Sequence, residues 1–397
     1  MTTTINNEHK KLNVPNLRFP EFQGEWERCK VSDLLDFYST NSLSWDKLEY
    51  GTDAIQNLHY GLIHVGLPTM IDLGKDKLPN ITNGNTPKNY EFCQEGDIAF
   101  ADASEDTNEV AKAVEFYKLN GKDVICGLHT IHGRDNQQKT VVGYKGYAFS
   151  STTFHHQIRR IAQGTKIYSI NSKNFSECYI GIPSKGEQKK IATLLRLIDE
   201  RIATQNKIID KLQSLIRGIR NDVFGKFRKC VGVNAMVGDV LSYEQPQPYI
   251  VEDTEYTAEG TPVLTANKAF VLGYTSETDG IYDKGDCIIF DDFTLDCKYV
   301  DFPFKVKSSA IKILTAKDKE LLRYTFEFMK YLDLSTDEHK RHYIAETQNQ
   351  ELILPTVQVV RTIAHAFSAL SSRMRIVTKQ RDMFELQKQY LLRQMFI

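Results

Sequence analysis

The sequence predicts an α+β protein in which two globular domains alternate with two long helices. The chain has 397 residues, 41% of them apolar, which is enough for two or three domains that each bury a core. The segment 182–224 recurs in register at 354–396, and short strand-like runs precede each copy. We therefore expect globular regions at 1–181 and 230–353 and antiparallel helices at 182–229 and 354–397, as an internal pseudo-two-fold repeat.

The N-terminal sequence and the cysteines limit the class of protein. No apolar run at the start resembles a signal peptide, and no stretch approaches the roughly 18 apolar residues of a membrane span. We expect a soluble, cytoplasmic protein without a membrane partner. The seven cysteines are scattered, with no C-x-x-C pair and no neighbouring histidine at zinc-ligand spacing. We interpret them as reduced and mostly structural, and predict no metal site.

Charge is distributed unevenly along the chain. The net charge is −1, but residues 185–229 hold 12 Lys and Arg against 5 Asp and Glu. Residues 230–355 are acidic, with 12 basic and 22 acidic side chains. Any DNA contact in that region must come from a local basic patch, because the general field there is negative. This is the main observation against a nucleic-acid partner.

The recurring segment reads as a long helix in both copies. An offset of 172 residues pairs Pro183 with Pro355, Ile191 with Ile363 and Phe224 with Phe396. In the first copy Ser184 is a predicted N-cap with Glu187 three residues on, and Gly225 is a predicted stop. Apolar residues in both copies alternate steps of four and three, as in a coiled coil. The seam positions proposed to bind a partner are Ile191, Leu195, Ile198, Ile202, Ile363, Phe367, Leu370 and Met374.

Two functions fit such helices. A helix of about 38 residues spans nearly 60 Å, more than one turn of B-DNA, which suits a spacer. The alternative is a pair of ordinary bundle helices inside one domain. Two copies in register favour the spacer, because a shared seam phase predicts that the helices pair with each other or bind equivalent partners.

Each globular region carries strand-like runs rich in Val, Ile, Tyr and Phe, separated by Gly, Asn and Asp turns. The two regions share faint parallels: VSDLLDF at Val31 resembles VGDVLSY at Val237, and EGDIAF at Glu95 resembles KGDCIIF at Lys284. These parallels predict that the globular regions are also related to each other.

Several polar stretches are candidates for nucleic-acid contact. HTIHGRDNQQK at His129 predicts a loop whose Arg, Asn and Gln side chains suit base edges. TLDCKYVDFPFKVKSS at Thr294 interleaves lysines with aromatics, which suits phosphate contact with stacking, but also fits an amphipathic strand. A surface loop without function is the alternative for the others. The candidates from these stretches and from QNLHYG and LTANKAF are Asn57, His59, Tyr60, His132, Arg134, Lys139, Asn267, Lys268, Thr294, Lys298, Tyr299, Lys305 and Lys307.

The chain resembles the specificity subunits of type I restriction-modification systems over nearly its whole length. The resemblance rests on the opening NLRFPEFQGEWE and above all on IPSKGEQKKIA at the head of the first helix. The residues usual in this family at the head of the helix are present at Pro183, Glu187, Gln188 and Ile191, but Ser184 stands where a second proline is common. The second copy lacks the Glu-Gln pair. ADASEDTNEVAKAVEF, followed by GLHT, resembles a pattern of the family's target-recognition domains, and adds Ser104, Lys112 and His129 as candidates.

The resemblance implies a non-catalytic subunit with two target-recognition domains. Each would read one half of a split site in double-stranded DNA, with the helices as a ruler for the unread gap. The helices would dock two methyltransferase subunits, and two translocating restriction subunits would complete the endonuclease. S-adenosylmethionine, ATP and magnesium are expected on those partners and no cofactor on this chain, because the target adenine would be flipped into a partner's pocket.

Two other classes remain as alternatives. An enzyme is disfavoured, because the sequence has no G-x-G-x-x-G, no Asn-Pro-Pro-aromatic stretch and no G-x-x-x-x-G-K-[ST]. Asp291, Asp292 and Asp296 suit magnesium in principle, but also a solvated acidic strand end. A coiled-coil scaffold that binds only proteins gains weight from the acidic region 230–355, and salt-dependent DNA binding that requires both domains would discriminate against it.

Overall fold

The computed structural model describes residues 13–266, 269–334, 336 and 341–397. The chain divides into two compact units: unit 1 comprises Met1–Thr204 and Gln380–Ile397, and unit 2 comprises Gln205–Lys379. Each unit holds one α+β globule, one end of the first long helix and one end of the second. This confirms the predicted fold class.

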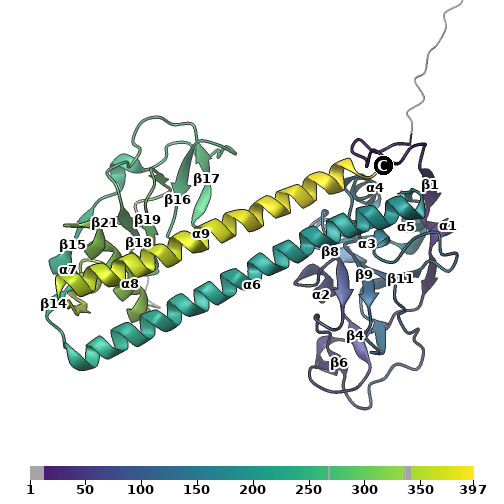
Figure 1. The fold of residues 1–397 in the computed structure, drawn as a ribbon, viewed down its shortest axis with the longest axis horizontal. Helices are drawn as coiled ribbons and strands as arrows, with labels where there is room; N and C mark the ends of the chain where they lie inside the picture. The colour runs from purple at the N-terminus through teal and green to yellow at the C-terminus, as the bar shows by residue number, and fades with distance from the viewer. Residues whose placement is uncertain (1–12, 267–268, 335, 337–340) are drawn as a thin grey trace, which may run out of the picture. The chain divides into compact units, whose positions relative to one another are not determined.

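The two long helices, α6 (Lys185–Cys230) and α9 (Val357–Gln394), are each continuous (Figure 1). Their first residues differ by the offset that relates the two sequence copies. In unit 1, Leu195 of α6 shares a core with Leu391 of α9, and in unit 2 the late residue Val223 shares a core with the early residue Val360. The helices therefore run antiparallel, as predicted. None of the described helices is long and apolar enough to cross a bilayer.

The ends of α6 follow the sequence signals only in part. The Ser184 hydroxyl accepts from the backbone N–H of Glu187, as predicted. The Glu187 carboxylate does not bond back to the cap; it holds Arg18 through two hydrogen bonds of 2.7 and 2.8 Å. The predicted stop at Gly225 is wrong, because α6 continues to Cys230. Gly232, with φ +76°, takes the left-handed conformation that turns the chain.

Unit 1 is built on two larger sheets and two pairs of strands. One has the strand order β2-β11-β7-β9-β5 and the other β10-β4-β6-β3, with β4–β10 and β5–β9 parallel. The strands are β1 (Glu27–Lys30), β2 (Asp36–Tyr38), β3 (Leu48–Glu49), β4 (Gln56–Leu58), β5 (Met70–Asp72), β6 (Asn80–Ile81), β7 (Ile98–Ala101), β8 (Ala103–Ser104), β9 (Ala113–Lys118), β10 (Val124–Cys126), β11 (Thr130–Arg134), β12 (Tyr168–Ser169) and β13 (Tyr179–Ile182). The helices are α1 (Val31–Leu34), α2 (Tyr60–His64), α3 (Tyr144–Phe149), α4 (Thr152–Ile161) and α5 (Ser172–Ser176), with a 3₁₀ turn at Trp45–Lys47.

Two cores hold unit 1 together. The inner core joins the long helices to β7 and to α3, α4 and α5, and contains Phe100, Phe149, Phe154 and Phe175. The outer core involves both sheets and contains Leu58, Ala99, Phe116, Cys93 and Cys126. Because side chains alternate along a strand, neighbouring residues of β7 supply both cores.

Unit 2 repeats this topology. Its sheet order β15-β21-β18-β19 corresponds to β2-β11-β7-β9, and its second sheet, β17-β16-β20, again contains a parallel pair. The strands are β14 (Ala235–Met236), β15 (Leu241–Glu244), β16 (Thr261–Leu264), β17 (Val271–Thr275), β18 (Cys287–Asp291), β19 (Cys297–Val300), β20 (Lys305–Val306), β21 (Ile311–Ala316) and β22 (Glu351–Leu352). The helices are α7 (Val237–Val240) and α8 (Lys319–Leu332), with 3₁₀ turns at Gln247–Tyr249 and Thr347–Asn349.

The sequence parallels mark equivalent elements. VSDLLDF spans α1 and the start of β2, and VGDVLSY spans α7 and most of β15. In each unit the strand before the long helix pairs with the first strand of the globule, β13 with β1 and β22 with β14. The predicted relationship between the globules is confirmed by their shared topology.

Candidate nucleic-acid interface

The candidate site of unit 1 lies where two parallel strands end. β4 and β10 are parallel, so their carboxyl ends meet at one edge of the sheet. β4 leads into His59 and α2, and β10 leads into the turn Gly127–His129. The backbone N–H of Tyr60 donates to the Leu128 carbonyl, which joins the two segments. Residues from two distant stretches thereby reach one surface.

Aromatic and imidazole rings cover this surface. Trp45 lies 4.6 Å from His59, His59 lies 4.7 Å from Tyr60, and Tyr60 lies 5.2 Å from His129, all between ring centroids. Trp45 is 46% exposed and His129 is exposed, while His59 is buried between its neighbours. We call Trp45, Tyr60, His64, Ser104, Lys112 and His129 the recognition surface of unit 1. Ring faces of this kind stack on bases.

His59 supports this surface from beneath. Its Nδ1 accepts from the backbone N–H of Gly61, 3.1 Å away, and so caps α2. Burial, and next the charge of His129, lower the pKa of His59. Both effects favour the neutral ring, which is the form that keeps a free lone pair on Nδ1 for the cap.

His129 occupies a strained backbone position. Its φ is +53°, in the left-handed region that favours glycine. Its imidazole donates to the Asp102 carboxylate at 3.1 Å, and the Asp102 backbone N–H donates to the His129 carbonyl. Strain of this kind is found at functional sites, where the surroundings hold the residue in place.

A cationic edge completes the recognition surface. The Lys112 ammonium lies 2.7 Å from the Glu109 carboxylate and donates to the His64 carbonyl. His64 in turn donates to the carbonyl of Ala103, beside Ser104 in β8. The side chains of His64, Ser104, Glu109 and Lys112 are all partly exposed. His64 and Trp45 were missed by the sequence interpretation, because neither lies in a stretch with a distinctive pattern.

Gly127 and Asn57 explain how close the two segments come. Asn57 is buried, and its side-chain oxygen accepts from the Asn41 amide at 2.6 Å. A Cβ on Gly127 would lie 2.5 Å from the Asn57 amide nitrogen, so only glycine fits there. Asn57 therefore builds the site from below and does not face solvent.

The predicted loop at His129–Lys139 is wrong in its first half, because Thr130–Arg134 form the buried strand β11. His132 and Arg134 bind the Asp97 carboxylate at 2.7 and 2.8 Å. Burial acts to raise the pKa of Asp97, but these hydrogen bonds outweigh it and the pKa is lowered. Lys139 is half-buried, 3.7 Å from Glu27. The sheet thus takes up polar residues that the sequence pattern placed on the surface.

Unit 2 has an equivalent position. The Asp292 backbone N–H donates to the Ala310 carbonyl, as that of Asp102 does to His129. Ser104 and Thr294 each lie two residues after the equivalent aspartate, so Ser104 of unit 1 corresponds to Thr294 of unit 2. The buried Asp292 carboxylate accepts from the backbone N–H groups of His342 and Tyr343.

Arg341 lies 5.6 Å from the centre of the exposed Phe293 ring. We call Phe293, Thr294, Lys307 and Arg341 the recognition surface of unit 2. Phe293 and Arg341 were missed by the sequence interpretation, since only the fold brings residue 341 beside the loop after β18.

The remaining candidates of unit 2 lie in different environments. Lys307 is exposed, and Lys298 in β19 is partly exposed. Lys305 is buried and binds the Glu277 carboxylate at 2.6 Å. The Tyr299 hydroxyl donates to Asp286, and its ring packs under Arg323. Asn267 and Lys268 lie outside the described residues.

The helix seam faces the chain's own cores. Ile191, Leu195 and Ile198 are buried in the inner core of unit 1, and Ile202 packs against it. Ile363 and Phe367 are buried in unit 2, while Leu370 and Met374 are partly buried. A different set of apolar side chains on the helices is exposed: Leu197, Leu215, Ile376, Met383, Leu386 and Tyr390.

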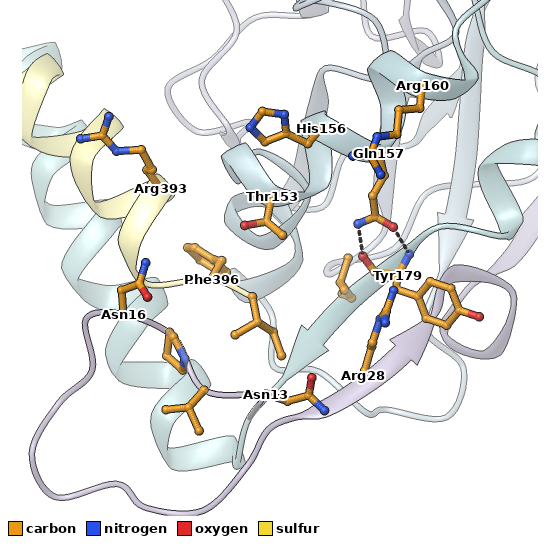
Figure 2. Close-up of a pocket in the computed structure, with 14 residues that line it drawn as sticks. Asn13, Asn16, Arg28, Thr153, His156, Gln157, Arg160, Tyr179, Arg393 and Phe396 are labelled. Carbon is orange, nitrogen blue, oxygen red and sulfur yellow. Dashed lines mark hydrogen bonds between the residues drawn. The ribbon is translucent and has the colours of Figure 1, made fainter. Parts of the chain in front are cut away.

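A basic pocket in unit 1 lies apart from the recognition surface. Figure 2 shows Arg28, Arg160, His156 and Arg393 around it, with the amide of Gln157 bonded to the backbone of Tyr179. The Arg28 guanidinium stacks on the Tyr179 ring at 4.4 Å. These arginines are exposed, so the pocket adds positive charge to this end of unit 1.

Comparisons with known proteins agree with this architecture. Residues 77–214 match the family described as the type I restriction modification DNA specificity domain. The type I restriction enzyme EcoR124I/EcoR124II specificity subunit of Escherichia coli is 44% identical over 126 residues, which are 30% of this chain and 31% of that protein. The match thus spans less than a third of that relative.

Solved structures extend the likeness in fold to almost the whole chain. The type I restriction-modification S subunit from M. genitalium has a TM-score of 0.63 at 16% identity, covering 97% of this chain and 99% of that one. A chain from a structure on complex assembly and conformational transition of the type I R-M system has a TM-score of 0.51 at 12% identity, covering 92% and 96%.

The repeated α+β globule on paired long helices is the fold of those solved S subunits, and residues 77–214 match a DNA specificity domain. The chain is thus similar in part of its sequence, and in the fold of almost its whole length, to the specificity subunits of type I restriction-modification systems.

Proposed function

We propose that this chain reads a bipartite site in double-stranded DNA, one half with each globule. The observation that carries the proposal is the repeat: the same sheet order occurs twice, and an aspartate-anchored surface follows the equivalent strands β7 and β18. Two related readers in one chain can address a site whose halves differ in sequence, as the two subunits of a dimer address a palindrome.

The recognition surface of unit 1 supplies the contacts that reading requires. Tyr60, His129 and Trp45 offer ring faces and polar edges, and Ser104 offers a hydroxyl. Lys112 lies at the rim, where a cation contacts phosphate and sets the position of the protein on the duplex. In unit 2 the corresponding groups are Phe293, Thr294, Lys307 and Arg341.

The acidic balance of 230–355 is compatible with this role. Several of its carboxylates are occupied: Asp292 binds backbone N–H groups, Glu277 binds Lys305, and Glu327 binds Arg220 and Arg323. Paired carboxylates contribute less field at the surface than free ones. Lys307 and Arg341 then form the local patch that DNA contact in this region needs.

We further propose that α6 and α9 are the partner-binding elements. Most of their seam residues pack inside the chain, so a partner would contact the exposed apolar residues. Met383, Leu386 and Tyr390 lie three and four residues apart, on one face of α9, and are 60, 65 and 50% exposed. Two methyltransferase subunits and two restriction subunits would bring S-adenosylmethionine, ATP and magnesium, and would methylate adenine and cleave in the bacterial cytoplasm.

Exchange of one globule tests the two-reader proposal. Replacing residues 236–353 by the same region of another specificity subunit should change one half of the methylated motif and leave the other half unchanged. A matched exchange of the first globule should change the other half. A single exchange that changes both halves would refute the proposal.

The ruler proposal has its own test. Four residues inserted near Gln205 lengthen a helix by about 6 Å, or about two base pairs of DNA. The gap in the methylated motif should lengthen while both half-sites stay the same. An unchanged gap would refute the ruler. A protein-binding scaffold is the second candidate, favoured by the acidic 230–355 region, and it predicts no salt-dependent DNA binding by the chain.

A further inference from the structure

Three metal-ligating side chains meet inside unit 1, although they are far apart in the sequence. Cys93 lies before β7, Cys126 ends β10, and His132 is in the middle of β11. Their ligand atoms all lie within 4.8 Å of one another, and the two sulfurs are 3.6 Å apart. All three residues are buried, so this cluster belongs to the interior and not to the recognition surface.

The imidazole of His132 has one nitrogen held by a carboxylate and the other left for a ligand. Its Nε2 donates to the Asp97 carboxylate at 2.7 Å, and Arg134 holds the same carboxylate. Its Nδ1 is buried without a hydrogen-bond partner in the part of the chain that the structure describes. A buried polar atom of this kind is costly unless something satisfies it. A carboxylate behind the distal nitrogen is the usual support of a metal-bound histidine.

Unit 2 provides an internal control for the fold. The Cys93 N–H donates to the Val124 carbonyl, and the Tyr282 N–H donates to the Phe304 carbonyl in the same way. Cys126 pairs with Leu58 as Val306 pairs with Leu264.

His132 pairs with Ala99 of the central strand, as Ile313 pairs with Ile289. The counterparts of the three ligands are therefore Tyr282, Val306 and Ile313, which lie in the equivalent core of unit 2. The topology does not require cysteine or histidine at any of these positions, yet unit 1 has a ligand-type residue at all three.

We propose that Cys93, Cys126 and His132 bind a thiophilic divalent cation of the zinc class. Two sulfurs on one tetrahedral Zn²⁺ lie about 3.8 Å apart, given Zn–S bonds of about 2.3 Å, and the observed separation is close to this. A disulfide would need the sulfurs to approach to about 2.05 Å. Binding releases both thiol protons, and the two thiolates then balance the charge of the ion.

The proposed site is joined to the recognition surface of unit 1 through the end of β10. Cys126 precedes Gly127, and the turn Gly127–His129 carries the strained His129. A bound ion would tie the end of β10 to β11 and to the segment before β7, and so fix both ends of this turn. The sequence interpretation found no metal site, because thirty-two residues separate the cysteines and five separate Cys126 from His132.

Metal content and spectroscopy of the full chain test the proposal. After purification with zinc and exhaustive dialysis, the chain should retain about one zinc per molecule. Co²⁺ added to the metal-free chain should give thiolate-to-cobalt charge-transfer bands and the visible bands of a tetrahedral site. Cys93→Ser and Cys126→Ser should abolish both signals, whereas Cys178→Ser, which removes another buried thiol of unit 1, should retain them.

A measurement on the unaltered chain guards against variants that fail to fold. Zinc-edge X-ray absorption should show two sulfur neighbours at about 2.3 Å and a nitrogen at about 2.0 Å. Zinc should also raise the melting temperature of the unaltered chain and of Cys178→Ser alike. Absence of retained zinc, a first shell without sulfur, or equal cobalt bands in the folded Cys126→Ser variant would each overturn the proposal.

Discussion

Replacing His129 by glycine should separate stability from recognition. With φ at +53°, a residue other than glycine costs about 1 kcal/mol in the left-handed region. The side chain is half exposed, so its contact with Asp102 contributes well under about 1 kcal/mol. The free energy of unfolding should therefore stay the same or rise by up to about 1 kcal/mol.

DNA binding should move in the opposite direction. The imidazole lies against Tyr60 in the recognition surface, and loss of one stacking or hydrogen-bonding group costs about 1–3 kcal/mol of binding. The dissociation constant should rise about 5- to 150-fold, since 1.4 kcal/mol corresponds to a factor of ten. The loss should be confined to the half-site that unit 1 reads.

Gln138→Gly is the matched control. Gln138 has φ +54° and an exposed side chain, but it lies in the turn after β11 and outside the recognition surface. It should gain similar stability and bind DNA as before. Urea unfolding and duplex titrations of the assembled methyltransferase measure both quantities. Unchanged DNA binding by His129→Gly, or a stability loss of about 2 kcal/mol, would refute the reasoning.

Three further predictions address the sites and the core. Burial and His129 lower the pKa of His59, so the folded state binds fewer protons than the unfolded state near and below about pH 6.5, and the free energy of unfolding should fall as the pH drops through that range. The variant His59→Asn keeps a capping oxygen and should lose less stability than the unaltered chain between pH 7.5 and 5.5, as measured by urea titrations. An equal loss in both proteins would contradict the assignment. Lys307→Ala should weaken DNA binding and reduce the slope of log binding constant against log salt concentration by about 0.9. Lys305→Met breaks the buried pair with Glu277 and should lower the melting temperature but leave that slope unchanged. Salt titrations in which only Lys305→Met changes the slope would contradict the assignment of Lys307 as the DNA contact. Phe224→Ala removes a fully buried ring that touches Tyr324, Phe328 and Tyr331. The variant should lower the free energy of unfolding of unit 2 by about 3–5 kcal/mol, measured by urea denaturation. A loss under about 1 kcal/mol would contradict the packing.

The long helices and the repeat were predictable because periodicity and offset are properties of local sequence. Ile191 and Ile363 share a seam phase, and the helices begin at equivalent residues. What the apolar seam of the helices packs against was less predictable. Seam positions have the same pattern whether a partner or the chain itself covers them, and here the cores of the two units cover six of the eight.

The candidate site was only partly accessible from sequence. Tyr60 and His129 come together because two parallel strands end at one edge, which the sequence patterns did not reveal. His132 and Arg134 have the polarity of a surface loop, but the Asp97 carboxylate satisfies both inside the sheet. Trp45, Phe293 and Arg341 carry no local signal, since their role depends on which distant segment lies beside them.

Methylome sequencing of a host without its own restriction-modification systems measures whether this chain directs methylation to two half-sites. The host would carry this chain with a cognate methyltransferase subunit, and each protein alone as a control. We expect a split motif with methyladenine in both halves, present only when both proteins are expressed. Methylation by this chain alone, or a single uninterrupted methylated motif, would contradict the two-reader proposal.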